Sequence, residues 1–151
     1  MSDYEYRQLG PGDIQLFRDL LGVFAEAFGE PQTYLPAQPG DAYLRKLLGQ
    51  DTFIAVVALD RDEVVGGLAA YVLEKFEQAR SEIYIYDLAV AEAHRRKGIA
   101  TGVIRHLQGV AKTYGAWVIF VQADPGDAPA LNLYASLGTR EDVYHFDIPV
   151  S

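Results

Sequence analysis

The stretch Leu88-Ala89-Val90, followed after three further residues by His94-Arg95-Arg96-Lys97-Gly98-Ile99-Ala100, is the most specific pattern in this chain. It predicts a strand that ends, a basic turn, and a helix that begins at small residues. The first N–H groups of a helix have no partner within the helix and lie at the positive end of its dipole. Small residues let a phosphate reach those groups, and three basic side chains add positive charge. The stretch therefore predicts an anion-binding loop.

The charge around this loop is opposite to that of the rest of the chain. The net charge of the 151 residues is −8. Residues 92–112 contain five basic residues and one acidic residue, which leaves 8 basic and 20 acidic residues elsewhere, a balance of −12. This distribution indicates that the loop binds an anion and that the acidic field of the other residues attracts a cationic partner. The alternative is that the acidic surface only keeps the protein soluble. Nucleic acid is a poor fit as a partner, because the field repels phosphates.

The composition excludes several other classes of protein. The chain has no cysteine, which rules out a thiol nucleophile, a thiolate zinc site and a disulfide scaffold, and fits a cytoplasmic location. No apolar run approaches the ~20 residues of a membrane helix, and the N-terminus lacks the pattern of a secretory signal. We therefore expect one cytoplasmic domain over residues 1–151, with no membrane partner.

Periodicity outward from the loop predicts an α/β domain with a mixed central sheet flanked by helices. Expected strands are residues 4–9, 52–60, 64–73, 82–90, 116–123 and 143–148. Expected helices follow the capping residues Asp13, Asp41 and Asp127, and a fourth covers residues 98–114. Residues 29–40 contain three prolines and are expected to form a long surface loop. Strand–helix–strand units late in the chain imply that part of the sheet is parallel.

The loop resembles the signature of the GNAT superfamily of N-acetyltransferases, in which Arg or Gln precedes Gly-x-Gly or Gly-x-Ala. Arg95, Gly98 and Ala100 match this signature. Residues 130–138 (A-L-N-L-Y-A-S-L-G) resemble a second family motif, A-x-x-L-Y-x-x-x-G-F. The chain departs from the family pattern at Asp127, where Asn is usual, and at Thr139, where Phe is usual.

The resemblance implies that the chain has a single-domain GNAT fold and that it uses acetyl-CoA as its co-substrate. The loop would cradle the pyrophosphate, and the backbone of the preceding strand would pair with the pantetheine arm. The cofactor-binding residues implied in this way are Leu88, Ala89, Val90, Arg95, Arg96, Lys97, Gly98, Ile99, Ala100, Thr101, Asp127 and Ala130. Many GNAT proteins pair through their edges, so the resemblance also implies a homodimer.

Residues 75–90, 121–124 and 143–147 look like the type I aminoglycoside 3-N-acetyltransferases. This resemblance implies that the substrate is an aminoglycoside such as gentamicin, acetylated on the 3-amino group of its deoxystreptamine ring, which gives antibiotic resistance. A polycationic substrate would also account for the acidic field. The alternatives are a GNAT enzyme that acts on a polyamine or a protein N-terminus, and an acyl-CoA-binding module without catalytic activity.

Direct transfer of the acetyl group from acetyl-CoA to an amine needs a base near the attacking amine and an acid near the departing sulfur. Asp87 is the candidate base. Strict alternation would place Asp87 on one face with Ile83 and Ile85, where burial would raise its pKa. Alternatively, a bulge shifts the register and turns Asp87 toward the cleft. A covalent route lacks support, because no serine lies in a Gly-x-Ser-x-Gly elbow.

The resemblance makes Tyr134 the candidate acid that protonates the thiolate. Besides Asp87, the candidate partners of the substrate ammonium groups are Glu82, Asp124, Glu141 and Asp142. The three histidines do not have metal-ligand spacing, so no metal is expected.

Overall fold

A computed structural model describes residues 3–151 of the chain. The strands are β1 (Tyr4–Gln8), β2 (Phe53–Asp60), β3 (Glu63–Glu74), β4 (Ser81–Val90) and β5 (Ala116–Val121). The helices are α1 (Ile14–Phe28), α2 (Pro31–Tyr34), α3 (Asp41–Leu48), the short 3-10 helix η1 (Glu92–His94), α4 (Ile99–Thr113) and α5 (Ala128–Leu137).

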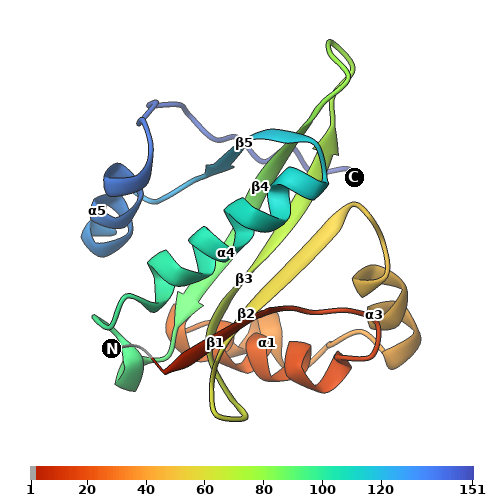
Figure 1. Ribbon diagram of the computed structural model, residues 1–151, viewed down its shortest axis with the longest axis vertical. Coiled ribbons are helices and arrows are strands. Elements are labelled where there is room, and N and C mark those ends of the chain that lie inside the picture. Colours follow the sequence, from red (N-terminus) through yellow and green to blue (C-terminus); the bar gives the residue numbers. More distant parts are fainter. Residues whose placement is uncertain (1–2) are drawn as a thin grey trace.

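The five strands form one sheet in the order β1-β2-β3-β4-β5. Neighbours from β1 to β4 are antiparallel, and β5 is parallel to β4. Helix α4 covers one face of this sheet, while α1 and α3 cover the other (Figure 1). The α/β architecture with a mixed sheet, predicted from the sequence, is therefore confirmed.

The central strands are buried on both faces, which explains their continuous apolar sequence. Seven of the eight residues of β2 are buried, as expected for a strand covered by helices on each side. Gly67 on β3 is needed for close packing here. A Cβ at this position would overlap the carbonyl oxygen of Val56 and lie 2.7 Å from Cδ1 of Leu20 on α1.

A β-bulge in β4 changes which residues face each layer. Ala69 of β3 pairs with Asp87, but Ala70 pairs with Ile85, so Tyr86 is the extra residue. As a result, Ile85 packs in the core under α4, whereas Ala69, the partner of Asp87, belongs to the core under α1. The bulge alternative is thus the correct one for Asp87, and strict alternation of this strand is wrong.

The pairing between β4 and β5 ends before β4 does. Its last pair is Ile85 with Val121, whereas β4 continues to pair with β3 as far as Val90. In the described chain, the edge of β4 from Tyr86 to Val90 that faces away from β3 therefore has no strand partner. This opening lies directly before the basic turn.

Other sequence predictions need correction. The strand expected at residues 143–148 does not form, because no strand of the described chain pairs with these exposed residues. The segment 29–40 is not entirely a loop, since α2 begins at a proline, which is tolerated in the first turn. Asp13 and Asp41 do not cap helices through their side chains; they bind Arg7 and Arg18 instead. In the described residues, no helix is long and apolar enough to cross a membrane.

Candidate active site

Asp87 lies on the face of the sheet that α1 covers, directly after the bulged Tyr86. Its carboxylate is half-buried, and the hydroxyl of Tyr34 donates a hydrogen bond to Oδ2 at 3.0 Å. Burial raises the pKa of Asp87 above its ordinary value; the Tyr34 hydrogen bond opposes that rise, and the charge of Glu30 adds to it. A carboxylate with a raised pKa, placed at an opening in a sheet, has the properties of a general base.

The Tyr34 side chain is itself held from two directions. Its ring lies 5.9 Å from the rings of both Phe24 and Phe28 on α1. Its carbonyl oxygen accepts a hydrogen bond from Gln38, whose side-chain oxygen accepts one from Arg18 at 2.7 Å. Tyr34, at the end of α2, is therefore fixed against Asp87 by contacts from α1 and from residues 35–40. No motif or spacing in the sequence points to Tyr34, which is 53 residues from Asp87.

A row of aromatic rings continues from Asp87 along the same face. The Tyr86 ring lies 5.9 Å from Tyr71 and 5.7 Å from Tyr84, and Tyr84 stacks on Phe120 of β5 at 4.8 Å. The Tyr84 hydroxyl donates to the side-chain oxygen of Gln122. Tyr71 and Tyr86 are exposed, so these rings offer an apolar surface beside the carboxylate.

The basic turn has the backbone that an anion-binding loop requires. Gly98 is the N-cap of α4 and has φ of 78°, in the left-handed region that favours glycine. A Cβ at Gly98 would meet no atom within 4 Å, so the space beside the helix terminus is open. The first hydrogen bond within α4 is donated by Gly102 to the Gly98 carbonyl. The N–H groups of Ile99, Ala100 and Thr101 therefore have no acceptor inside the helix.

The three basic side chains of the turn, Arg95, Arg96 and Lys97, are exposed. Nε of Arg95 donates to the Val90 carbonyl at 3.2 Å, so this residue also closes the turn onto the end of β4. In the part of the chain that the structure describes, none of the three pairs with a carboxylate within 4.0 Å, the limit for a salt bridge. Their positive charge is thus available to an anion at the start of α4.

The predicted cofactor residues of β4 line the opening between the strands. Leu88 and Val90 pack toward α4, and Ala89 packs toward α1. The unpaired edge that carries them leads to the start of α4. A free strand edge next to a helix N-terminus with uncompensated positive charge fits an extended ligand that ends in phosphates, such as coenzyme A.

The candidate acid Tyr134 comes from α5 and packs against the core under α4. It is half-buried, and burial, followed by the charge of Asp127, raises the pKa of its hydroxyl. Asp127 caps α5, because its side chain accepts a hydrogen bond from the N–H of Ala130 at 3.2 Å. The two remaining predicted cofactor residues thus form the start of this helix, as expected.

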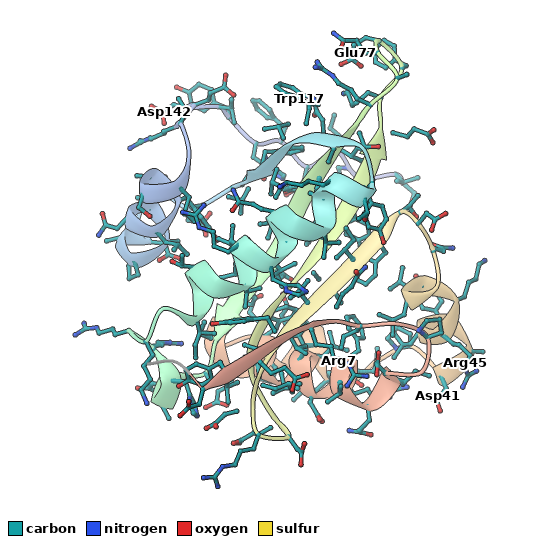
Figure 2. The ribbon with its side chains drawn as sticks, in the orientation of Figure 1. Arg7, Asp41, Arg45, Glu77, Trp117 and Asp142 are labelled. Atoms are coloured by element: carbon teal, nitrogen blue, oxygen red, sulfur yellow. The ribbon has the colours of Figure 1, made fainter. Side chains whose placement is uncertain are left out.

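The other acidic candidates do not gather around Asp87. Glu82 accepts a hydrogen bond from the Trp117 indole at 3.1 Å and lies 3.9 Å from Lys75. Glu82 is five residues before Asp87 on the strand, roughly 15 Å away at the usual strand rise. Trp117 lies near the hairpin between β3 and β4, which carries Glu77, and away from Arg7, Asp41 and Arg45 (Figure 2).

Asp124, Glu141 and Asp142 are exposed and follow β5 and α5. Asp142 pairs with Arg140 at 2.7 Å, and Figure 2 shows it beyond α5. Within residues 3–151, none of the three forms a hydrogen bond or an ion pair with Asp87. Among residues 3–151, no group of three His, Asp or Glu side chains could hold a metal ion.

Together these features fit a protein that binds an extended, phosphate-bearing ligand between two diverging strands, with a carboxylate beside it. The model of the Acetyltransferase (GNAT) family matches residues 17–139. The chain belongs to the GNAT family and has its fold, as the resemblance implied. Proteins of this family bind acetyl-CoA, and acetyl transfer is the activity of this chain.

Three similar proteins are acetyltransferases of an aminoglycoside or of streptothricin. The aminoglycoside acetyltransferase HMB0005, from an uncultured soil metagenomic sample, is 56% identical over 100% of both chains, with a TM-score of 0.97. The aminoglycoside acetyltransferase meta-AAC0020, from a similar source and in complex with sisomicin, is 33% identical with a TM-score of 0.90, covering 98% of this chain and 97% of its own. The streptothricin acetyltransferase of Streptomyces lavendulae is 28% identical over 91% of this chain and 82% of its own.

Proposed function

We propose that this protein transfers the acetyl group of acetyl-CoA to an aminoglycoside, at the 3-amino group of the deoxystreptamine ring, and thereby gives resistance to the antibiotic. The observation that carries the proposal is the half-buried Asp87 carboxylate, held by Tyr34 at the point where β4 and β5 diverge. The 56% identity to an aminoglycoside acetyltransferase over the whole chain supports the same acceptor class. The cytoplasmic location and the homodimer remain predictions of the sequence.

When bound, acetyl-CoA supplies an activated thioester. The N–H groups of Ile99, Ala100 and Thr101, with the charges of Arg96 and Lys97, would hold its pyrophosphate. The free edge of β4 at Leu88 and Val90 would hold the pantetheine arm. The open space beside Gly98 and the uncompensated charge of the turn support this assignment.

Asp87 would accept the proton of the substrate ammonium group, so that the amine can attack the thioester. Its raised pKa, caused chiefly by burial, brings its basicity nearer to that of the amine. Tyr134 would donate its proton to the departing sulfur. Its raised pKa keeps the hydroxyl protonated throughout the working pH range. The two groups belong to opposite faces of the sheet, one on the α1 side and one on the α4 side.

The acceptor side suits a polycation with sugar rings. The acidic balance outside residues 92–112 attracts positive charge. The aromatic row beside Asp87 offers flat apolar surfaces to ring faces. If this attraction matters, kcat/KM for gentamicin should fall as salt rises, since the Debye length decreases from ~10 Å at 0.1 M to ~3 Å at 1 M. If kcat/KM does not change with salt while acetyl-CoA is saturating, the acidic residues serve only solubility.

The decisive experiment is turnover of acetyl-CoA with a panel of gentamicin, sisomicin, streptothricin, spermidine and a peptide with a free N-terminus. The position of the acetyl group on each product is read by NMR. The proposal expects the highest kcat/KM for gentamicin or sisomicin and acetylation at the 3-amino group. Acetylation at another amino group would overturn the position only. A preference for spermidine or the peptide would overturn the acceptor class, and binding of acetyl-CoA without any turnover would leave only a binding module.

A further inference from the structure

Strand β1 contacts helix α4 and the turn before it at three places. The side chains of Tyr4, Tyr6 and Gln8 alternate with exposed residues and share one face of the strand. The hydroxyl of Tyr4 and Nδ1 of His94, the last residue of η1, lie 3.1 Å apart and share a hydrogen bond. At the other end of α4, Nε2 of Gln8 donates to the hydroxyl of Tyr114 at 3.1 Å. The N-terminal end of β1 therefore lies beside the turn that carries the predicted anion loop (Figure 1).

The middle residue of the three, Tyr6, lies against the first turn of α4. A Cβ at Gly102 would overlap the hydroxyl and Cζ of Tyr6 and lie 2.8 Å from its Cε1. The N–H of Gly102 also donates the hydrogen bond to the Gly98 carbonyl that closes this turn. Glycine is unfavourable inside a helix, so the close approach of the Tyr6 ring explains the glycine at position 102.

The Tyr6 ring has little room to move away from the helix. It is half-buried and packs against the core under α4. Its two neighbours on the same face, Tyr4 and Gln8, are each held by a hydrogen bond near one end of α4. A side chain added at position 102 would therefore displace the first turn of α4 more readily than the ring. That turn carries the N–H groups of residues 99–101.

We propose that Tyr6 is a positioning residue for the cofactor: its contact with Gly102 fixes the N–H groups of residues 99–101 at the place where the pyrophosphate of acetyl-CoA binds. Tyr6 acts on the cofactor only through the backbone of α4. The inference rests on the proposed assignment of this loop as the phosphate site, and it does not depend on which amine the enzyme acetylates.

The test is the affinity of the full-length protein for acetyl-CoA, measured by calorimetric titration. Gly102→Ala in the native chain should raise the Kd by roughly five- to tenfold, because binding must return the displaced turn to its place against Tyr6. Tyr6→Leu alone should raise the Kd by about two- to fourfold, because the turn loses its support. In the Tyr6→Leu background, Gly102→Ala should change the Kd by less than about twofold, because leucine lacks the ring atoms that a Cβ would overlap.

Gly109→Ala is the matched control within the same helix. Gly109 is exposed, and a Cβ there would meet no atom within 4 Å. Its variant should keep the native Kd and have a higher Tm, since alanine favours a helix more than glycine does. Thermal unfolding of every variant without ligand shows that each measured Kd belongs to folded protein, so a change in stability alone does not account for a change in Kd.

An unchanged Kd in Tyr6→Leu, or an effect of Gly102→Ala that is equal in both backgrounds, would overturn the positioning role. Gly98→Val, measured in parallel, tests the phosphate site itself. A loss of affinity in Gly98→Val but not in Gly102→Ala would overturn only this inference, whereas no loss in either would overturn the assignment of the loop as well. If the affinities change as expected but aminoglycosides are not acetylated, the proposed acceptor is wrong and this inference stands.

Discussion

Residues 3–111 and residues 112–151 differ completely in burial. Every buried residue that the structure describes lies in the first region, between Leu9 and Ala111. None of residues 112–151, all of them described, is buried, although they include Trp117, Phe120 and Phe146. The first region therefore holds the fully buried core of the scaffold. The second packs on this core only through half-buried side chains such as Ile119, Val121 and Leu133.

The proposed chemistry divides along the same line. The scaffold holds the proposed base Asp87 and the predicted anion loop, whose geometry is fixed by a bulge, a glycine N-cap and close packing. The second region supplies the proposed acid Tyr134 and the acidic candidates Asp124, Glu141 and Asp142. A rigid base with a more adaptable acid and acceptor wall would let one scaffold accept related antibiotics of different shape.

The largest expected effects test this division of roles. Asp87→Asn keeps the size of the side chain but removes the base, so kcat should fall by roughly 10²–10⁴. High pH should partly restore kcat, because the substrate ammonium group then loses its proton without help from a base on the enzyme. Tyr134→Phe should lower kcat with little change in substrate binding, and high pH should not restore it. Rate profiles from about pH 6 to 9 measure both. Identical pH responses would show that the assignment of acid and base is wrong.

The difference in packing predicts unequal effects of an added methyl group on the free energy of unfolding. Gly67→Ala in the scaffold would force Cβ against the Val56 carbonyl and Leu20, so it should lower the free energy of unfolding by about 1–3 kcal/mol. Gly126→Ala in the second region meets no atom within 4 Å and should change it by less than about 0.5 kcal/mol. Denaturant titrations of both variants provide the comparison. Equal losses of stability would mean that the second region is as tightly packed as the first.

The two ends of α4 allow the anion loop to be tested against a matched control. Gly98→Val should weaken acetyl-CoA binding about tenfold or more, because a branched side chain strains the left-handed backbone and fills the open space beside the helix N-terminus. Gly115→Val has similar backbone strain, since Gly115 has φ of 66° and equally open surroundings, but it lies at the other end of the helix. Calorimetric titration should find its affinity nearly unchanged. Equal losses at both sites would remove the loop as the phosphate site.

Tyr34 provides a test of positioning within the scaffold. Tyr34→Phe removes a hydrogen bond that lowers the pKa of Asp87, so the acidic limb of the kcat profile should move to higher pH. The kcat should fall roughly three- to tenfold, as expected for the loss of one hydrogen bond. Tyr43→Phe on α3, where the ring is 62% exposed, is the control and should change neither. A lower kcat with an unmoved acidic limb would limit Tyr34 to a structural role.

Some features set by neighbouring residues could be predicted from the sequence, whereas features set by distant pairing could not. The start of α4 at Gly98 and the Asp127 cap depend on residues within one helical turn, and both form as predicted. The face of the sheet on which Asp87 lies depends on a bulge that only the pairing of β4 with β3 reveals. Tyr34 reaches it across 53 residues. The pattern at residues 143–148 does predict a strand, but a strand needs a partner, and no strand among residues 3–151 pairs with this segment.

The smallest expected effect is on stability, and it measures how far the half-buried carboxylate of Asp87 lowers the stability of the fold. The pKa of Asp87 is higher in the folded protein than in the unfolded chain, chiefly because of burial. The folded state therefore binds its proton more readily, so the stabilisation from protonated Asp87 is complete below the unfolded pKa and is lost as pH rises through the folded pKa. Above the folded pKa the carboxylate is ionised, and its half-buried charge destabilises the fold. Asp87→Asn removes that charge and can still accept the hydrogen bond from Tyr34.

The Tm of Asp87→Asn should exceed that of the native protein at pH 7.5, by less than the change that Gly67→Ala produces. The difference in Tm should shrink toward pH 4. Thermal unfolding of both proteins across this range measures it. A Tm difference that is negative, or independent of pH, would mean that Asp87 is held by compensating contacts and is not a strained base.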